Sequence, residues 1–175
     1  FQGVIAIVPP FEYCEVEDIL QYAKEREENP FVLILDGIED PHNLGAIIRT
    51  AETAGVHGII IPKRRACSVN STVYKVASGA VEHMKIARVN NLNDEIKYLK
   101  ENDVWIYGTA IEAKKYYYEE NLTGAIAIVI GNEGDALKSG EEVAAQAASM
   151  LLQAIDKSYV QLPKVVEIEI VVIVI

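Results

Sequence analysis

Short apolar runs recur along this chain and are the strongest constraint on its fold. Residues 31–36 form a continuous apolar run bounded by turn residues, and similar runs occupy residues 58–61, 86–89, 104–107 and 125–130. Continuous apolar character is typical of strands that are buried on both faces of a parallel sheet. Such a sheet needs a packed layer on each side, so we expect helices on both faces.

The segments between these runs show helical periodicity. Apolar side chains within residues 44–55 fall on one stripe, and the charged segment 94–101 is amphipathic. Strand and helix therefore alternate, which predicts an α/β fold with a mostly parallel sheet. The charged stretch 24–30 predicts the end of a preceding helix, so residues 1–30 are interpreted as a linker and lead-in segment and residues 31–175 as one domain.

The distribution of charge matters because the chain is acidic. Its 16 basic and 26 acidic residues give a formal charge of −10, so a phosphate backbone would repel the chain unless basic residues cluster locally. Lys63, Arg64 and Arg65 form the densest basic cluster, directly after the second predicted strand. They predict a nucleic-acid contact, and a solvated loop is the alternative.

The remaining composition points to a cytoplasmic protein. The two cysteines, Cys14 and Cys67, show neither metal-ligand spacing nor a disulfide framework, which favours a reducing compartment and no metal. No apolar run reaches the roughly 20 residues that a membrane helix needs, and no signal peptide opens the chain. We therefore expect no membrane partner.

The first candidate ligand site is the helix predicted after the first strand. Residues 40–43 form a helix start signal in which Asn43 is expected to be the cap, and the exposed amides of the first turn favour an anionic group. Arg49 is expected off the apolar stripe and above Gly45, which would leave room beside the guanidinium for bidentate binding of a phosphate. A solvated arginine on an amphipathic helix is the alternative.

The second candidate is a glycine-containing turn at the end of the last buried strand. Ile130 is followed by Gly131, Asn132, Glu133 and Gly134. Glycines at the carboxyl end of a parallel strand allow close approach of a ligand, and a Glu or Asn can hold hydroxyl groups of a ribose. A tight turn without a ligand is the alternative.

Residues 108–110 end another strand in the same manner. Gly108, Thr109 and Ala110 could line the same pocket as the turn that follows Ile130. A simple strand-to-loop turn explains them equally well.

Residues 33–52, 58–65, 75–83 and 130–134 together resemble the SpoU (TrmH-type) RNA ribose 2′-O-methyltransferases, in particular the branch that modifies guanosine in 23S rRNA. Order, spacing and residue types agree over residues 1–137. The resemblance implies a SPOUT-type, trefoil-knotted methyltransferase domain in residues 31–175. It also implies S-adenosylmethionine as cofactor, a homodimer, and an RNA substrate that is ribosomal.

The resemblance also assigns roles to residues. Arg49 matches the family's proposed catalytic residue, and Asn43 and Glu133 match residues near it. Because an arginine hardly ever gives up its proton, orienting a phosphate and stabilising charge is easier to defend for Arg49 than acting as a base. The cofactor side would comprise Gly108, Thr109, Ala110, Ile130, Gly131, Asn132, Gly134 and Leu162, and the RNA side Lys63, Arg64 and Arg65.

Residues 135–175 depart from the family pattern. The third signature motif is not matched, and Leu162 with Pro163 is the sole echo of its turn. Residues 141–155 carry an apolar helical stripe, and residues 165–175 predict a strand. The start at Phe1 suggests an excised fragment without the small RNA-binding domain that precedes this one in full-length relatives.

Three functional hypotheses follow. The first is an RNA 2′-O-methyltransferase. The second is a non-catalytic or engineered protein of the same fold whose cofactor pocket is incomplete, because the third motif is not matched. The third is an unrelated α/β nucleotide-binding module.

Overall fold

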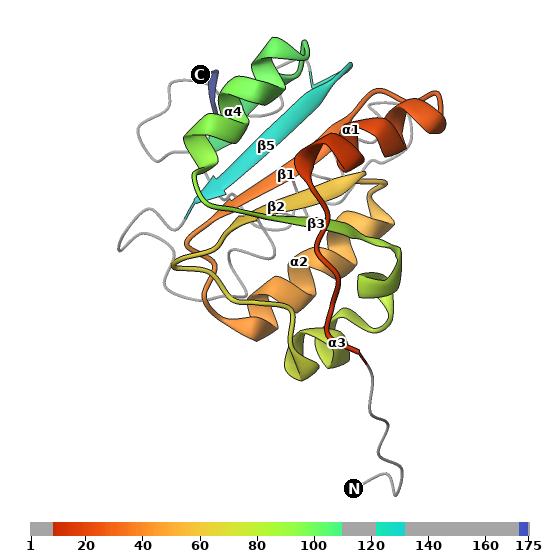
Figure 1. The fold of residues 1–175 in the computed structure, drawn as a ribbon, viewed down its shortest axis with the longest axis vertical. Helices are drawn as coiled ribbons and strands as arrows, with labels where there is room; N and C mark the ends of the chain where they lie inside the picture. The colour runs from red at the N-terminus through yellow and green to blue at the C-terminus, as the bar shows by residue number, and fades with distance from the viewer. Residues whose placement is uncertain (1–8, 110–121, 132–171, 175) are drawn as a thin grey trace, which may run out of the picture.

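A six-stranded sheet runs through the part of the chain that the computed structural model describes, residues 9–109, 122–131 and 172–174 (Figure 1). The spatial order of the strands is β3-β2-β1-β5-β4-β6. All neighbours from β3 to β4 pair in parallel, and β6 pairs antiparallel with β4. The strands are β1 (Phe31–Asp36), β2 (Gly58–Pro62), β3 (Lys85–Val89), β4 (Trp105–Thr109), β5 (Ile126–Gly131) and β6 (Val172–Val174).

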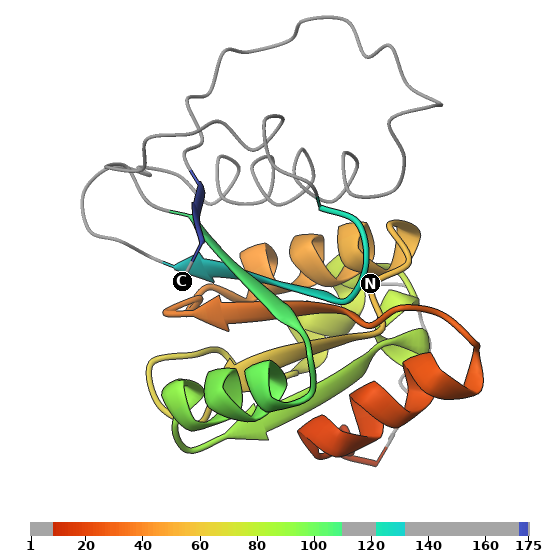
Figure 2. The same ribbon diagram turned by 90° about the horizontal axis from the view of Figure 1, so that it is seen from above.

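Helices cover both faces of this sheet. Figure 2 shows α2 and α3 above it and α1 and α4 below it. The predicted mostly parallel α/β architecture with helices on both faces is therefore confirmed. The helices are α1 (Val16–Glu25), α2 (Pro41–Thr53), α3 (Ser71–Ala77), the 3-10 helix η1 (Ala80–His83) and α4 (Leu92–Glu101).

Alternation along each strand divides the apolar side chains between two cores. Leu33 and Leu35 of β1 belong to the core that contains Ile47 of α2, whereas Val32 and Ile34 belong to the core that contains Ile19 of α1. All of them are buried. Successive strand residues point to opposite faces, so one unbroken apolar run supplies both layers.

The chain before α1 covers the outer edge of β3. Cys14 N donates a hydrogen bond to Ile86 O at 3.0 Å, and Cys14 makes an isolated parallel bridge with Ala87. Nearby, the rings of Phe11 and Tyr13 pack edge to face at 5.1 Å. This segment shields the unpaired backbone of an edge strand, which is a common way of protecting a sheet edge.

The strand order reverses at β1. From β1 the chain builds outward through α2 to β2 and then through α3 and η1 to β3, and through α4 it reaches β4 on the far side of β5. Strands β1 and β5 are therefore neighbours although about 90 residues separate them in sequence. In open α/β sheets, ligands bind at the carboxyl edge where the order reverses in this way.

The segments expected near the chain ends are described only in part. Of the predicted strand 165–175, residues 172–174 form β6, whereas the predicted helix 141–155 lies outside the described residues. The division at residue 30 stays a proposal, and α1 within the lead-in segment packs against the sheet through Val16, Ile19 and Ala23. Among the described segments, every helix falls short of the length and apolar character that crossing a membrane requires.

Candidate functional site

Strands β1 and β5 end side by side at the carboxyl edge of the sheet. They pair along their whole length, and their last pair is Asp36 with Gly131. Strand β4 adjoins β5 on its other side and reaches the same edge at Gly108 and Thr109. The structure therefore brings Gly108, Ile130 and Gly131 onto adjacent strand ends, together with the backbone of Thr109.

These strand ends suit a ligand that approaches the backbone closely. Gly108 and Gly131 have no side chain to fill the space above their strands. Gly108 and Ile130 are buried, whereas Asp36 at the end of β1 is exposed. A flat heterocycle or ribose can lie against backbone of this kind, which is how α/β sheets receive nucleotide ligands.

Helix α2 carries the two candidate catalytic residues that the structure describes. Asn43 is half-buried in the first turn, close to the carboxyl edge, and Arg49 is exposed six residues later. Six helical residues correspond to about 9 Å along the axis. Within residues 9–109, 122–131 and 172–174 no side chain forms an ion pair with Arg49. Its guanidinium can therefore meet an oxyanion from solution.

The cap of α2 is not the residue that the sequence suggested. Asn43 was expected to cap this helix, but the cap is Asp40, and Asn43 occupies the third helical position. The Asp40 carboxylate accepts hydrogen bonds from His42 N at 3.4 Å and Asn43 N at 3.3 Å. Two of the amides expected to attract an anionic ligand are thus already bonded, so the first turn is a weaker anion site than expected.

The expectation about Gly45 was also wrong. Gly45 does not leave room beside Arg49, because α3 fills the space. A Cβ at position 45 would lie 2.7 Å from the Cβ of Val76 and 3.1 Å from Val73 O. The glycine is needed for close packing of α2 on α3, and Arg49 lies one turn beyond that contact.

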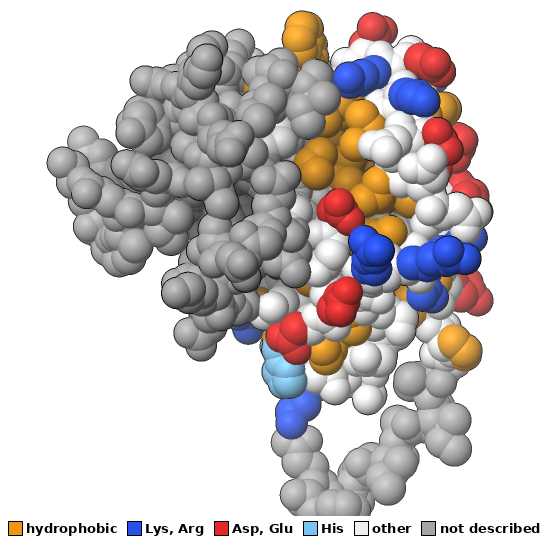
Figure 3. Space-filling model, turned by 90° about the vertical axis from the view of Figure 1, so that its left-hand side faces the viewer, with side chains coloured by type: hydrophobic (Ala, Val, Ile, Leu, Met, Phe, Trp, Pro, Cys, Tyr) orange, Lys and Arg blue, Asp and Glu red, His pale blue; other side chains and the backbone are white. Residues whose placement is uncertain are grey.

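The basic cluster lies at the same edge, in the loop that follows β2. Lys63, Arg64 and Arg65 are all exposed, as predicted for a surface contact. Figure 3 faces this edge and shows Lys and Arg side chains interspersed with Asp and Glu side chains. The described surface here carries both positive and negative charges. Attraction for phosphate must therefore come from the local placement of cations rather than from a uniform positive field.

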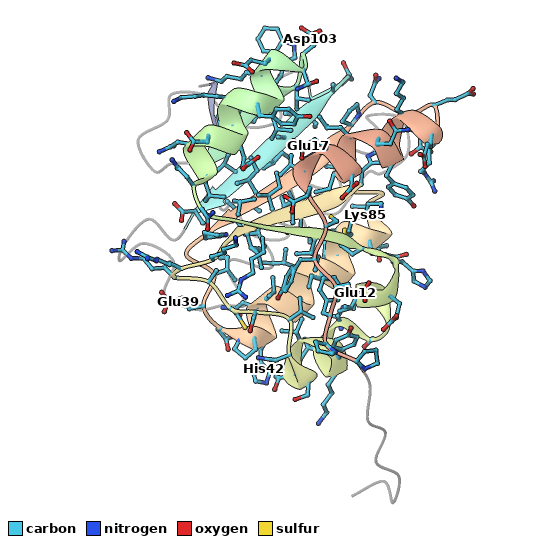
Figure 4. All side chains as sticks on the ribbon, viewed as in Figure 1. Glu12, Glu17, Glu39, His42, Lys85 and Asp103 are labelled. Atoms are coloured by element: carbon cyan, nitrogen blue, oxygen red, sulfur yellow. The ribbon has the colours of Figure 1, made fainter. Side chains whose placement is uncertain are left out.

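The loop after β2 is tied to the loop after β1. Cys67 N donates a hydrogen bond to Ile38 O at 2.8 Å. Burial raises the pKa of the Cys67 thiol, and the Asp40 carboxylate adds a smaller effect in the same direction. Figure 4 labels Glu39 and His42, which flank Asp40 in sequence and lie where α2 begins. The start of α2 and the basic cluster therefore belong to one edge.

The three histidines lie either in the core or on the surface. His57 is buried, and its Nδ1 accepts the backbone N–H of Phe31 at 3.0 Å. The ring proton is consequently on Nε2, which donates to Glu28 Oε2 at 2.8 Å. His42 and His83 are exposed. Within the described ranges, no group of three or more His, Cys, Asp or Glu side chains is arranged to hold a metal.

A cavity of about 870 Å³ lies elsewhere, between the lead-in segment, α3 and β3. Phe11, Tyr74 and Met84 contribute apolar walls, and Glu12 and Glu82 contribute carboxylates. None of the candidate site residues lines it. It is therefore separate from the edge where the candidate residues gather.

Several predicted site residues lie outside the described part of the chain. Glu133, the third candidate catalytic residue, lies outside the described residues, as do four of the proposed cofactor-binding residues: Ala110, Asn132, Gly134 and Leu162. The segment expected to form the knot lies there as well.

Sequence reasoning missed two side chains at this edge. Tyr13 Oη accepts a hydrogen bond from Val69 N at 2.9 Å, and Arg88 Nη2 donates one to Lys63 O at 3.3 Å. Both bonds secure the loop that carries the basic cluster. No local signal could have found them, because Tyr13 and Arg88 are each distant in sequence from the loop that they contact.

Comparison with known proteins agrees with this arrangement. Residues 30–152 match the model of the SpoU rRNA Methylase family. The Bacillus subtilis (strain 168) protein YacO, whose name places it in the TrmH family of tRNA/rRNA methyltransferases, is 46% identical over 136 residues. That alignment covers 78% of this chain but 55% of the relative, so the chain spans about half the length of its relative.

Solved structures show the same fold at low sequence identity. An rRNA methyltransferase from Sinorhizobium meliloti, crystallised with AdoMet, superposes with a TM-score of 0.66 at 22% identity, covering 82% of this chain and 60% of the other. A protein described as an RNA 2′-O ribose methyltransferase gives 0.61 at 22% identity, covering 73% and 56%. Because the family model matches residues 30–152, which include all of β1 to β5, the chain belongs to the SpoU rRNA methylase family.

Proposed function

We propose that this chain is the catalytic part of an S-adenosylmethionine-dependent RNA methyltransferase that modifies a ribose 2′-hydroxyl in 23S rRNA. The observation that carries the proposal is the shared carboxyl edge: strand ends without side chains at Gly108 and Gly131 lie near a helix that presents the exposed Arg49. Family membership, a relative named as a tRNA/rRNA methyltransferase and a structural neighbour named as a 2′-O ribose methyltransferase support the reaction class.

The strand ends supply the cofactor side. Gly108, Ile130 and Gly131 are proposed to fit a nucleoside because the two glycines carry no side chain at the strand ends, and the structurally similar Sinorhizobium meliloti enzyme was crystallised with AdoMet. Thr109, Ala110, Asn132, Gly134 and Leu162 are proposed to complete this side. When bound, the cofactor supplies a sulfonium methyl group, which is already a good electrophile.

The remaining chemistry is alignment and removal of one proton. The sulfonium would methylate the ribose 2′-oxygen, S-adenosylhomocysteine would be the leaving group, and the hydroxyl proton would pass to water. Arg49 binds the adjacent phosphate and stabilises charge, because a guanidinium retains its own proton. Asn43 and Glu133 are proposed to orient the ribose. Holding both reactants in line supplies most of the rate that such a transfer needs.

The RNA side and the assembly follow from the same proposal. Lys63, Arg64 and Arg65 bind phosphates beside the reacting nucleotide. A cytoplasmic homodimer with a trefoil knot belongs to the same proposal. Because the overall charge is −10, attraction for RNA must come from local cations such as Lys63, Arg64 and Arg65.

The test measures cofactor binding first and methyl transfer to RNA second. Isothermal calorimetry with S-adenosylmethionine and with S-adenosylhomocysteine should show binding in the micromolar range. Methyl transfer to a 23S rRNA fragment should be measured with labelled cofactor, and nuclease digestion should place the label on ribose. Arg49→Ala should abolish transfer while cofactor affinity is retained, and Lys100→Ala, an exposed basic residue on α4, should behave as the parent.

A second candidate function is non-catalytic RNA binding by a protein of the same family. It is favoured by the departure of residues 135–175 from the third family motif. RNA binding without cofactor binding at high micromolar concentration would support this second function and reject the first. Full transfer by Arg49→Ala would reject the role proposed for Arg49.

A further inference from the structure

The loop that carries the basic cluster is anchored at both ends. We call residues 63–69 the basic loop. At its start, Lys63 N donates to Val89 O at 2.8 Å, and Lys63 O accepts from Arg88 Nη2 at 3.3 Å. At its end, Val69 N donates to Tyr13 Oη at 2.9 Å. The exposed cations thus project from a segment whose two ends are fixed.

The two anchoring side chains also contact each other. The guanidinium carbon of Arg88 lies 5.6 Å from the centre of the Tyr13 ring, within the range of a cation–π interaction. Tyr13 comes from the lead-in segment and Arg88 from β3. One pair of side chains, drawn from segments 75 positions apart, therefore connects the beginning of the basic loop to its end.

Arg88 is a costly residue if its role is only to stabilise the fold. Its Nε is buried, and no described group accepts a hydrogen bond from it. A buried donor without a partner lowers stability, and each such group in a folded protein calls for an explanation. An unbranched apolar side chain would fill much of the same space without this cost. The placement of a guanidinium here points to a use for its charge and its bond to Lys63.

The backbone conformation of the basic loop indicates that the surrounding structure fixes the loop. Arg65 has a φ of 55°, the left-handed region that residues with a Cβ rarely adopt. Such a conformation persists where the surrounding structure fixes the chain on both sides. The anchors at Lys63 and Val69 provide that constraint, together with the bond from Cys67 N to Ile38 O.

We propose that Tyr13 and Arg88 are positioning residues for RNA binding, which hold the basic loop, and with it the three cations, in one conformation that binds RNA phosphates. This inference rests on the proposed function, because it assumes that the basic loop binds RNA. A pre-ordered loop loses less conformational entropy on binding than a free one, so the pair strengthens RNA binding without touching RNA. The pair acts before the chemical step and leaves cofactor binding alone.

The test compares Tyr13→Phe with Tyr22→Phe. Tyr13→Phe removes the acceptor for Val69 N and keeps the ring. Tyr22→Phe is the matched control, because the hydroxyl of Tyr22 on α1 also accepts a hydrogen bond, here from Arg26, and the Tyr22 ring also faces a cation. Tyr13→Phe should raise KM for the RNA about fivefold, the size of one lost hydrogen bond, with kcat and cofactor affinity unchanged. Tyr22→Phe should change none of these.

Trypsin provides a readout that does not depend on activity. It cleaves after Lys63, Arg64 and Arg65, and the rate should rise about fivefold in Tyr13→Phe but not in Tyr22→Phe. Cleavage after Lys97 and Lys100 of α4, followed in the same digests by mass spectrometry, should stay constant and so excludes global unfolding. Equal cleavage of the basic loop in parent and Tyr13→Phe would overturn the proposal.

Substitutions of Arg88 distinguish a role in positioning the basic loop from a role in stabilising the fold. Arg88→Met removes the unpartnered Nε, so thermal stability should hold or rise, yet KM for the RNA should increase. Arg88→Lys keeps a charge and a donor and should recover part of the affinity. Faster cleavage in Tyr13→Phe and Arg88→Met with unchanged KM would show that the anchors serve the fold alone. If the parent transfers no methyl group, the proposed function fails, and the Kd for the same RNA, by fluorescence anisotropy, decides the role of the pair.

Discussion

Gly45 of α2 and Val76 of α3 approach so closely that a Cβ at position 45 would lie 2.7 Å from the Val76 Cβ. Real Cβ atoms essentially never come this near another carbon, so the pair fixes how the two helices pack. Helix α3 in turn follows the basic loop directly. The contact therefore connects the helix that carries Arg49 to the segment that carries the cations.

Gly45→Ala should destabilise the protein despite the better helix propensity of alanine. The gain in propensity is about 1 kcal/mol. Overpacking against Val76 and the backbone oxygen of Val73 costs about 1–3 kcal/mol, because a backbone atom cannot rotate away. We expect a lower urea midpoint with an unchanged m-value. In a Val76→Gly background the penalty should shrink, and equal penalties in both backgrounds would contradict the packing role.

Sequence patterns within single segments predict the strands, but they do not predict the contact between Gly45 and Val76. Strands β1, β2 and β5 were predictable because each is an apolar run in which most residues are buried. Helix α3 was not predicted, because its seven residues bury only Val73 and Ala77 and show no clear period. The packing of Gly45 depends on a helix that joins it through tertiary structure, and spacing within one segment cannot show that.

The start of α2, in contrast, could be predicted from the sequence, because the signal for its cap is local. Asp40 is followed by Pro41 at the first helical position, where proline is favoured because its missing N–H is not needed. A cap lies directly before such a proline. Asn43 is also a good capping residue, but Asp40 is the one that directly precedes Pro41.

Asp40→Ala should therefore weaken α2. The substitution removes the acceptor for His42 N and Asn43 N, a loss of about 1 kcal/mol. Asp40→Asn keeps a side-chain oxygen and should retain most of that stability. Both variants can be compared by urea unfolding followed by circular dichroism. Equal stability of Asp40→Ala and the parent would show that the cap contributes nothing.

Glu28 makes the free energy of unfolding depend on pH in the acidic range. Hydrogen bonds from Arg26, and secondly from His57, lower the pKa of the Glu28 carboxyl. A carboxyl whose pKa is lower in the folded state binds more protons in the unfolded state, so its contribution is present above about pH 4 and is lost as the pH falls through the lowered pKa. Glu28→Gln should flatten the rise of unfolding free energy with pH below about pH 5. Glu101→Gln, exposed at the end of α4, is the control. Parallel pH profiles for Glu28→Gln and the parent would contradict the coupling.

Replacement of Arg64 should change how RNA binding depends on salt. If Arg64 neutralises one phosphate, Arg64→Ala should reduce the slope of log K against log salt by about 0.7–0.9, the number of counterions released per contact. Fluorescence anisotropy with an rRNA fragment at several salt concentrations gives the slope. Lys100→Ala removes the same charge from an exposed site on α4, on the other face of the sheet, and therefore controls for net charge. Identical slopes for Arg64→Ala and Lys100→Ala would mean that the basic loop acts through overall charge, since a direct phosphate contact must depend on position.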